Sequence, residues 1–422
     1  MPQLPRSVSS LPAAFFMAGS SAANLFGYEV MRSCSNSLFN ASFGVDKLPL
    51  ALTLIPLVLL PILFLYNRSL ERFGPKNTYL LTNILFALTL LGCIAGLKMG
   101  WYFASGILYV FRETYIVLVV EQAWSFINSQ MNKDDARRYS GKIMTLSSCG
   151  AILGGLSVHQ FAESFGTTTL LFIPALMAVP GILFGAMAYQ RGNTEFDRQP
   201  HRPRSENSSL ASSLGLESFK NHRVLHLILF LVLISQVYST LVTLNFQFFL
   251  AAAQLSMDQQ SSISGLIFSL LYVVSLTFQF VVSPRLMKKL SLQHIHVMIP
   301  LVHASAIAAT ILYPSITTAA CALILFKSLD YSIFRAAKEI LYIPLPFDAQ
   351  FRAKEFIDVF GNRGSKSVAS FLLSLYQQAG FTLTSSLLLW LNIAVTSSWI
   401  FIASPWNKAM ASTKEMDGGI IP

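Results

Sequence analysis

The chain has 422 residues, of which 53% are hydrophobic and only 12% are charged, and its mean hydropathy is +0.55. Soluble proteins carry about 25% charged residues, so this composition excludes an ordinary soluble protein and predicts an integral membrane protein. The net charge of +10 would suit a nucleic-acid-binding protein, but the excess Lys and Arg fall in loops on one side of the predicted spans, which indicates topology instead.

The first half of the chain divides into six predicted membrane spans, at residues 11–38, 48–66, 78–97, 101–128, 143–161 and 167–189. Two charged segments, 67–76 and 132–142, are predicted as a turn and a loop between spans. The fifth span is rich in small residues, including Gly150, Gly154 and Gly155. We interpret these glycines as sites of close helix packing and not as a phosphate loop, because no strand precedes them.

A polar, basic stretch rich in Pro and Ser occupies residues 190–223 and is predicted to be a flexible cytoplasmic linker. Six further spans are predicted after it, at 224–251, 260–284, 295–313, 315–343, 357–379 and 382–403. Lys and Arg cluster in alternate loops and at both termini, so both termini are expected in the cytoplasm. The expected domains are an N-terminal bundle (1–189), the linker (190–223), and a C-terminal bundle with a short tail (224–422).

The two halves resemble one another. A shift of 217 positions places Glu113 on Asp330 and Glu121 on Lys338, so that intramembrane charge recurs at matching positions of spans four and ten. The expected fold is therefore all-α, with twelve transmembrane helices in two pseudo-symmetric six-helix bundles. This layout resembles that of the major facilitator superfamily.

Charged residues concentrate between Phe326 and Ser367, although the flanking sequence is apolar enough for membrane. A charged side chain at mid-bilayer costs at least about 2.5–3.5 kcal/mol on insertion scales, so such residues are expected to face a bundle interior or an aqueous cavity. On an α-helix, Lys327, Asp330, Phe334 and Lys338 would form one stripe. The alternative is a salt-bridged core, with Lys327 paired to Asp330 and Arg335 paired to Glu339.

A desolvated anionic substrate requires fixed cations, and the intramembrane acids nearly balance the cations available. The candidate substrate-binding residues are Arg32, Arg112, Glu121, Lys327, Asp330, Arg335, Lys338 and Glu339. The candidates for gating or ion pairs are Glu29, Glu113, Asp358, Arg363 and Lys366. No metal site, cofactor or catalytic group is predicted: the cysteines are single, and no carboxylate or cysteine stands at metal-ligand spacing from His294, His296 and His303.

One motif consists of Lys338-Glu339, then Tyr342-Ile343-Pro344-Leu345, and then Gly361, Arg363, Lys366 and Ser367. It resembles the signature of the ATP/ADP translocase (nucleotide transporter) family. The family also carries Arg-Asp-Thr-Lys-Asp-Ser in its first span, where this chain has Arg32-Ser33-Cys34-Ser35-Asn36-Ser37. The substrate-binding Lys of the family is therefore replaced by Ser35, which leaves open a different nucleotide or a smaller metabolite.

The resemblance implies a secondary transporter that moves an anionic metabolite, such as a nucleotide in ATP/ADP-type exchange, by alternating access. The alternatives are a proton-coupled transporter of another small metabolite, with Glu121 as its proton carrier, or a non-transporting sensor or interaction protein. An enzyme is not expected, since no Ser-His-Asp order or paired catalytic carboxylates occur. The expected partners are the anion and the lipid bilayer, with no nucleic acid. We expect a monomer in the cytoplasmic membrane of a bacterium.

Overall fold

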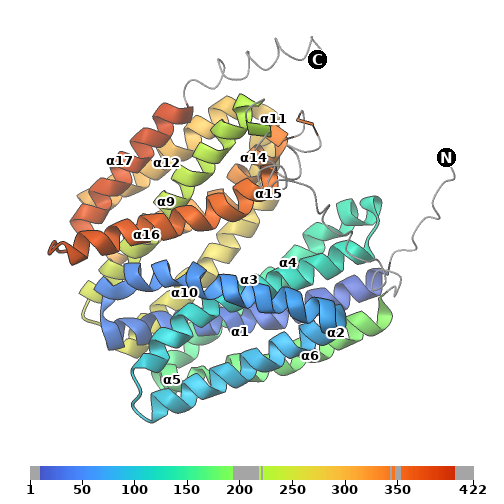
Figure 1. The fold of residues 1–422 in the computed structure, drawn as a ribbon. Coiled ribbons are helices and arrows are strands. Elements are labelled where there is room, and N and C mark those ends of the chain that lie inside the picture. The colour runs from blue at the N-terminus through green and yellow to red at the C-terminus, as the bar shows by residue number, and fades with distance from the viewer. Residues whose placement is uncertain (1–9, 193–217, 220–221, 343–344, 347–352, 404–422) are drawn as a thin grey trace. The chain divides into compact units, whose positions relative to one another are not determined.

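The computed structural model describes residues 10–192, 218–219, 222–342, 345–346 and 353–403 (Figure 1). These residues form helices and short connections, and no strand occurs among them. The helices of the first half are α1 (Leu11–Phe43), η1 (Val45–Lys47), α2 (Leu48–Lys98), α3 (Phe103–Gln130), α4 (Lys133–Phe165), α5 (Thr167–Leu170) and α6 (Phe172–Arg191). Those of the second half are α9 (Arg223–Ala252), α10 (Met257–Thr277), η3 (Phe278–Val282), α11 (Ser283–Lys289), α12 (Leu292–Leu312), α13 (Ile316–Leu329), η4 (Asp330–Phe334), α14 (Arg335–Tyr342), α15 (Lys354–Phe356), η6 (Ile357–Gly361), α16 (Asn362–Gln378) and α17 (Ser385–Ala403).

Nine helical segments of the described residues are long and apolar enough to cross a membrane. The segment Val45–Lys98 has 54 residues, which is long enough to cross a membrane twice. The helical geometry breaks at Gly74, which divides this segment into two helices. The polar helix α1 and the 17-residue, charged α16 supply two more candidates. The fold is therefore that of an all-α integral membrane protein, and the element order is consistent with the twelve predicted spans.

Two compact units divide the chain. Unit 1 contains the described residues of Met1–Gly44, Leu57–Arg202 and Leu255–Tyr272, and unit 2 contains those of Val45–Pro56, Pro203–Gln254 and Val273–Pro422. One boundary between the units falls within α2, after Pro56, and another falls within α10, after Tyr272. The greater part of α10 therefore belongs to unit 1, whose other residues come from the first half of the chain. Each unit is described separately below.

Helix α1 is the centre of unit 1, where α3, α4 and α6 pack against it (Figure 1). The glycines of α4 make the close approach possible. A Cβ atom at Gly150 would lie 2.0 Å from the Ala22 carbonyl oxygen, and one at Gly154 would lie 2.3 Å from that of Phe26. The prediction that these glycines serve helix packing is confirmed, because any larger side chain would meet α1 backbone.

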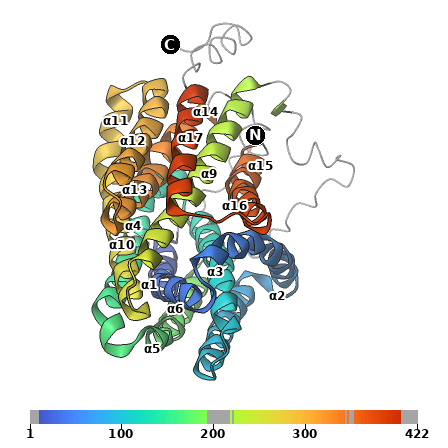
Figure 2. The ribbon, with the colours of Figure 1, turned by 90° about the vertical axis from the view of Figure 1, so that its left-hand side faces the viewer.

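In unit 2, α17 packs against α9 and α12 (Figure 2). A buried aromatic cluster joins these helices to α13. The His303 ring stacks on Tyr238 at a centroid distance of 4.9 Å, and it lies 5.7 Å from the Trp399 ring and 5.2 Å from the Phe326 ring of α13. A Cβ atom at Gly361 would lie 3.1 Å from Val232 Cγ1 on α9. The glycine at the start of the motif run 361–367 therefore lies where the chain passes close to α9.

Two connections differ from their predictions. The segment 67–76, predicted as a turn, is helical except at Gly74, whose φ of 74° is a conformation that glycine adopts without steric cost. The segment 132–142, predicted as a loop, forms the first turns of α4. The Asn132 side chain accepts a hydrogen bond from the Asp135 amide at 2.8 Å and caps this helix, so polar residues extend it beyond the apolar span.

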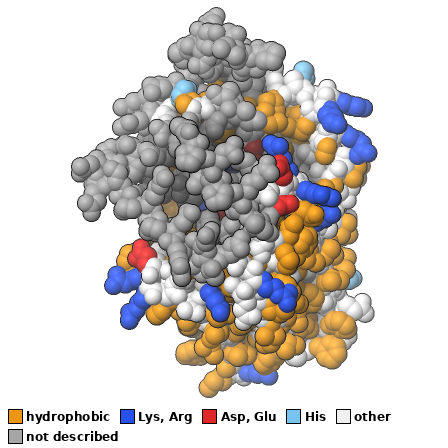
Figure 3. All heavy atoms as spheres, turned by 90° about the vertical axis from the view of Figure 1, so that its right-hand side faces the viewer, with side chains coloured by type: hydrophobic (Ala, Val, Ile, Leu, Met, Phe, Trp, Pro, Cys, Tyr) orange, Lys and Arg blue, Asp and Glu red, His pale blue; other side chains and the backbone are white. Residues whose placement is uncertain are grey.

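Apolar side chains cover much of the coloured part of the face drawn in Figure 3. On α2 alone, Leu57, Leu60, Phe64 and Leu65 are each more than 60% exposed. A surface of exposed apolar side chains is compatible with the hydrocarbon core of a bilayer, whereas in water it would promote aggregation. The greater part of the predicted linker 190–223, part of the Tyr342–Leu345 motif, and the tail after residue 403 lie outside the described residues.

Candidate functional site

The polar turn of α1 that carries Glu29 and Arg32 lies inside unit 1. Glu29 is fully buried, whereas the Arg32 side chain is 16% exposed. Arg32 Nη1 lies 3.3 Å from Glu29 Oε1, one helical turn away. The next residues of α1, from Ser33 to Ser37, are buried as well. A membrane helix with this polar face must find its partners on neighbouring helices.

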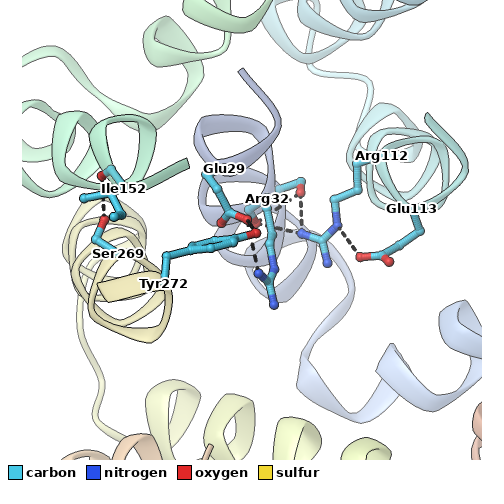
Figure 4. A network of polar contacts seen from close by, with 8 residues as sticks. Glu29, Arg32, Arg112, Glu113, Ile152, Ser269 and Tyr272 are labelled. Carbon is cyan, nitrogen blue, oxygen red and sulfur yellow. Dashed lines mark hydrogen bonds and ion pairs between the residues drawn. The ribbon is translucent and has the colours of Figure 1, made fainter. Parts of the chain in front are cut away.

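Arg112 of α3 supplies one of those partners (Figure 4). Its Nη1 donates hydrogen bonds to the Arg32 carbonyl oxygen at 2.7 Å and to Ser35 Oγ at 2.6 Å. Its Nε lies 3.3 Å from Glu113 Oε1, and its guanidinium carbon lies 4.1 Å from the Tyr109 ring centroid. Adjacent helix residues would be expected to point to different faces, yet the length of the Arg112 side chain allows this pairing with Glu113.

Helix α10 covers the other side of this polar turn. Tyr272 Oη donates to Glu29 Oε1 at 2.7 Å, and the Arg32 guanidinium carbon lies 3.8 Å from the Phe268 ring centroid. Phe268 and Tyr272 are four residues apart and so share a helix face. Ser269 Oγ donates to the Ile152 carbonyl oxygen at 2.9 Å, which attaches the same stretch of α10 to α4. Glu29, Arg32, Arg112, Glu113 and Tyr272 form what we call the unit 1 polar cluster.

Lys327 is the buried cation of unit 2. It lies near the end of α13, is 7% exposed, and donates from Nζ to Ser239 Oγ of α9 at 2.9 Å. Its ammonium also lies 5.3 Å from the Phe326 ring centroid. The predicted salt-bridge alternative paired Lys327 with Asp330, but the hydroxyl of Ser239 holds it on the neighbouring helix.

Lys338 and Glu339 both pair with residues beyond α14. Lys338, which is 7% exposed, pairs with Asp358 of η6, and Glu339 pairs with Lys354 of α15. The alternative pairing of Glu339 with Arg335 on the same helix is therefore wrong, because Lys354 occupies the Glu339 carboxylate. The structure thus pairs Lys338 of the translocase-like motif with Asp358, a residue twenty positions later that precedes the second part of that motif.

The predicted stripe from Lys327 to Lys338 is only partly present. Residues Asp330–Phe334 form a π-helical turn between α13 and α14, and a π-turn shifts the register of the residues that follow it. Lys327, Phe334 and Lys338 are buried, but Asp330 is half-buried. Residues three or four positions apart across this π-turn therefore do not all lie on the same helix face.

The remaining predicted residues are more accessible. Glu121 on α3 and Arg335 on α14 are exposed, as is Lys366 on α16, while Arg363 is half-buried. Glu121 does not belong to the unit 1 polar cluster, although it shares α3 with Arg112.

The sequence profile of the Major Facilitator Superfamily matches residues 12–334. This match spans most of the chain and decides its family. The chain belongs to the Major Facilitator Superfamily. It is accordingly a membrane transporter of the major facilitator type, and the family indicates transport and not enzymatic catalysis.

Curated relatives include ADP,ATP carrier proteins. The chain is 22% identical over 386 residues to ADP,ATP carrier protein 4 of Rickettsia conorii, which covers 81% of this chain and 74% of that protein. It is 34% identical over 102 residues to ADP,ATP carrier protein 3 of Rickettsia felis, but this match covers only 23% of the chain and 20% of that relative. These comparisons confirm both resemblances predicted from the sequence. The profile confirms the resemblance to the major facilitator superfamily, and the curated relatives confirm the similarity to ADP,ATP carrier proteins.

Solved structures of the superfamily share the fold. The transporter PepTSo of the POT family matches with a TM-score of 0.66 and 13% identity over 99% of this chain and 100% of that one. The nucleoside transporter NupG matches with a TM-score of 0.62 and 12% identity over 94% of this chain and 99% of that one. At such identities these likenesses establish the fold of this major facilitator protein and nothing about its substrate.

Three contact residues of the polar sites were not predicted from sequence. Phe268, Tyr272 and Ser239 lie in apolar or weakly polar stretches, and nothing in their local sequence separates them from packing residues. The four-residue spacing of Phe268 and Tyr272 is a weak signal, since two aromatic residues on one face of a membrane helix more often only pack. Their contacts with Arg32 and Glu29 depend on which helix lies beside α1.

Proposed function

We propose that this major facilitator protein is a secondary transporter of an anionic, phosphorylated metabolite of the nucleotide class, working by alternating access. The observation that carries the proposal is the pair of arginines on neighbouring helices of unit 1. Arg112 donates to the carbonyl oxygen of Arg32 itself, so two arginines meet at one turn of α1. Arginine suits phosphate because its planar fork donates two parallel hydrogen bonds.

The charge balance of the unit 1 polar cluster supports binding that is reversible. Glu29 pairs with Arg32 and Glu113 pairs with Arg112, at 3.3 Å in each pair. An anion that enters can replace these carboxylates as the partner of the guanidinium groups. Carriers need this exchange of partners, because a site with uncompensated buried cations would be too costly when empty.

Unit 2 offers two further buried cations for the same class of substrate. Lys327 is bonded to a neutral hydroxyl, and Lys338 is paired with Asp358. The similarity to ADP,ATP carrier proteins over most of the chain supports a nucleotide as the anion. We propose that Arg32, Arg112, Lys327 and Lys338 contact substrate, and that Glu29, Glu113 and Asp358 are their partners in the empty carrier.

The proposal also includes the arrangement in the membrane. The bundles are residues 1–189 and 224–422, joined by a cytoplasmic linker, and both termini are cytoplasmic in a bacterial cytoplasmic membrane. The one-sided placement of Lys and Arg supports this orientation.

The direct test is uptake by purified protein in proteoliposomes, with labelled ATP, ADP, other nucleotides, nucleosides and inorganic phosphate supplied in turn. We expect saturable uptake of one or more nucleotides, with no release of phosphate from ATP by the protein itself. Arg32→Ala and Arg112→Ala should each reduce uptake at least about tenfold, the loss expected for a desolvated charge contact. Arg285→Ala, on the exposed face of helix α11, is the matched control for loss of an arginine. Uptake of nucleosides alone, or equal uptake by all three variants, would contradict the proposal.

A further inference from the structure

A groove lies between the first turns of α1 and the last turns of α6 in unit 1, where the two helices pack side by side (Figure 1). It has a volume of about 260 Å³ and is lined by Pro12, Phe15, Phe16, Gly19 and Phe184. We call it the α1–α6 groove. Every lining residue is apolar or lacks a side chain, and Phe15 and Phe184 are 36% and 39% exposed. Pockets for drug-sized ligands measure roughly 300–1,000 Å³, so this groove suits a slender apolar chain.

Three exposed cations lie beside the α1–α6 groove. The Arg191 guanidinium carbon lies 4.3 Å from the centroid of the Phe16 ring, which lines the groove. Arg138 and Lys142 are four residues apart on α4 and so share a helix face. The Arg138 guanidinium carbon and Lys142 Nζ lie 5.5 Å and 5.1 Å from the Tyr139 ring centroid. All three side chains are exposed at this end of unit 1.

Two contacts connect these cations to the groove. The Tyr139 ring meets the Phe15 ring edge-on, with a centroid distance of 6.0 Å and an angle of 81°, so the α4 cations adjoin the groove wall. Ser10 Oγ donates to the Arg191 carbonyl oxygen at 2.7 Å, which fixes the end of α6 against the start of α1. The apolar wall and the cations therefore form one surface.

The cations also lie at the right level for lipid headgroups. Arg191 is the last residue of α6, and Arg138 and Lys142 lie in the first turns of α4, before the apolar span predicted from residue 143. Long cationic side chains at the ends of membrane helices reach the interface, where lipid phosphates lie. Arginine and lysine both bind phosphate, arginine through two parallel hydrogen bonds. A phospholipid has the matching chemistry, with apolar chains joined to a phosphate.

We propose that the α1–α6 groove binds an anionic phospholipid, with one acyl chain against Phe15, Phe16 and Phe184 and the headgroup phosphate at Arg191 and Lys142. This inference goes beyond the proposed function and does not depend on the substrate. The charge of the three cations selects the lipid. Phosphatidylglycerol has a net negative charge, whereas phosphatidylcholine carries a quaternary ammonium beside its phosphate. Each cation near an anionic lipid favours that lipid about fivefold.

The first test uses full-length protein in phosphatidylcholine vesicles, with a trace of phosphatidylglycerol or phosphatidylcholine that carries a photoreactive diazirine in one acyl chain. Peptides containing residues 11–19 and 184–191 should be labelled at least about tenfold more by the phosphatidylglycerol probe, because two cations each contribute about fivefold. Arg191→Gln/Lys142→Gln should abolish this preference. The control Arg285→Gln/Lys289→Gln removes two exposed cations of α11 and should keep it. Equal labelling of the wild type by both probes would overturn the proposal.

The second test fills the groove. A Cβ atom at Gly19 would meet the Phe184 ring at 3.6 Å, an ordinary contact, so the larger side chain of Gly19→Leu should extend into the groove and remove the label. Gly92→Leu is the control, because nothing lies within 4 Å of a Cβ atom there. Should Gly19→Leu fail to fold, the charge variants still decide. Labelling that appears only after deletion of residues 2–9, or only when the protein is diluted in the bilayer, would show that protein fills the groove and would overturn the proposal.

Discussion

Arg112 Nη1 lies 2.6 Å from Ser35 Oγ, which places a guanidinium from α3 at the position of α1 where the resembled translocases carry a lysine. A cation from another helix therefore lies beside the α1 position at which the resemblance leads us to expect one. The two residues are 77 positions apart, so the relationship is invisible in the motif itself.

The first prediction concerns this exchange of a cation between helices. Ser35→Lys should place a second positive charge against Arg112, which repels it in a desolvated site, and should lower both the thermal unfolding temperature and uptake. Ser35→Ala only removes a hydrogen bond to a charged group, worth about 1.5–3 kcal/mol, and should be milder. The double variant Ser35→Lys/Arg112→Ser moves the cation back to α1 and should recover stability. A double variant no better than Ser35→Lys would show that the two positions are independent.

The second prediction concerns the Lys338–Asp358 pair. Lys338→Ala removes a desolvated cation and leaves Asp358 without it, at a cost of about 2–5 kcal/mol, so nucleotide binding should weaken by more than about tenfold. Lys338→Arg should retain part of the activity, because it keeps the charge and changes the geometry. The double variant Lys338→Ala/Asp358→Ala should recover thermal stability but not transport. If it also recovered transport, Lys338 would be a structural ion pair and not a substrate contact.

The third prediction concerns the packing of α4 on α1. Gly154→Ala would put a Cβ atom 2.3 Å from the Phe26 carbonyl oxygen, so the helices must separate, and we expect a loss of stability of about 1–3 kcal/mol. Gly92→Ala on α2 is the control, since nothing lies within 4 Å of its Cβ position. Alanine should be neutral or stabilising there, because it has the higher helix propensity. Thermal unfolding in detergent measures both, and equal unfolding temperatures would contradict the packing argument.

The fourth prediction concerns topology. Single cysteines at Ser208, in the predicted linker, and at Ser256, immediately before α10, should be labelled from opposite sides of the membrane. The background is a variant without native cysteines, since Cys149 and Cys321 are exposed. A membrane-impermeant thiol reagent applied to intact cells and then to inverted vesicles distinguishes the two sides. Labelling of both from the same side would contradict the twelve-span topology.

The sequence by itself determined the class of protein and the approximate course of the helices. Apolar length and a low content of charge are enough for this, because a bilayer imposes helices of about 20 apolar residues whatever their neighbours are. The predicted spans from residue 224 onward accordingly lie close to the observed helices. The small residues of α4 were also interpretable, since only glycine permits such close backbone contact.

Only the tertiary structure decided which charges are partners. Local spacing offered Lys327 with Asp330 and Arg335 with Glu339 as alternative pairs, but Lys327 is bonded to Ser239 and Glu339 to Lys354, both from other helices. The π-turn at Asp330–Phe334 likewise breaks a stripe that assumed regular α-helix. A charge buried in a membrane protein is stabilised by a polar group that the packed helices bring within about 3 Å. Because Lys and Arg side chains are long, that group can belong to any of several neighbouring helices. That choice depends on helix packing, which no local pattern in the chain encodes.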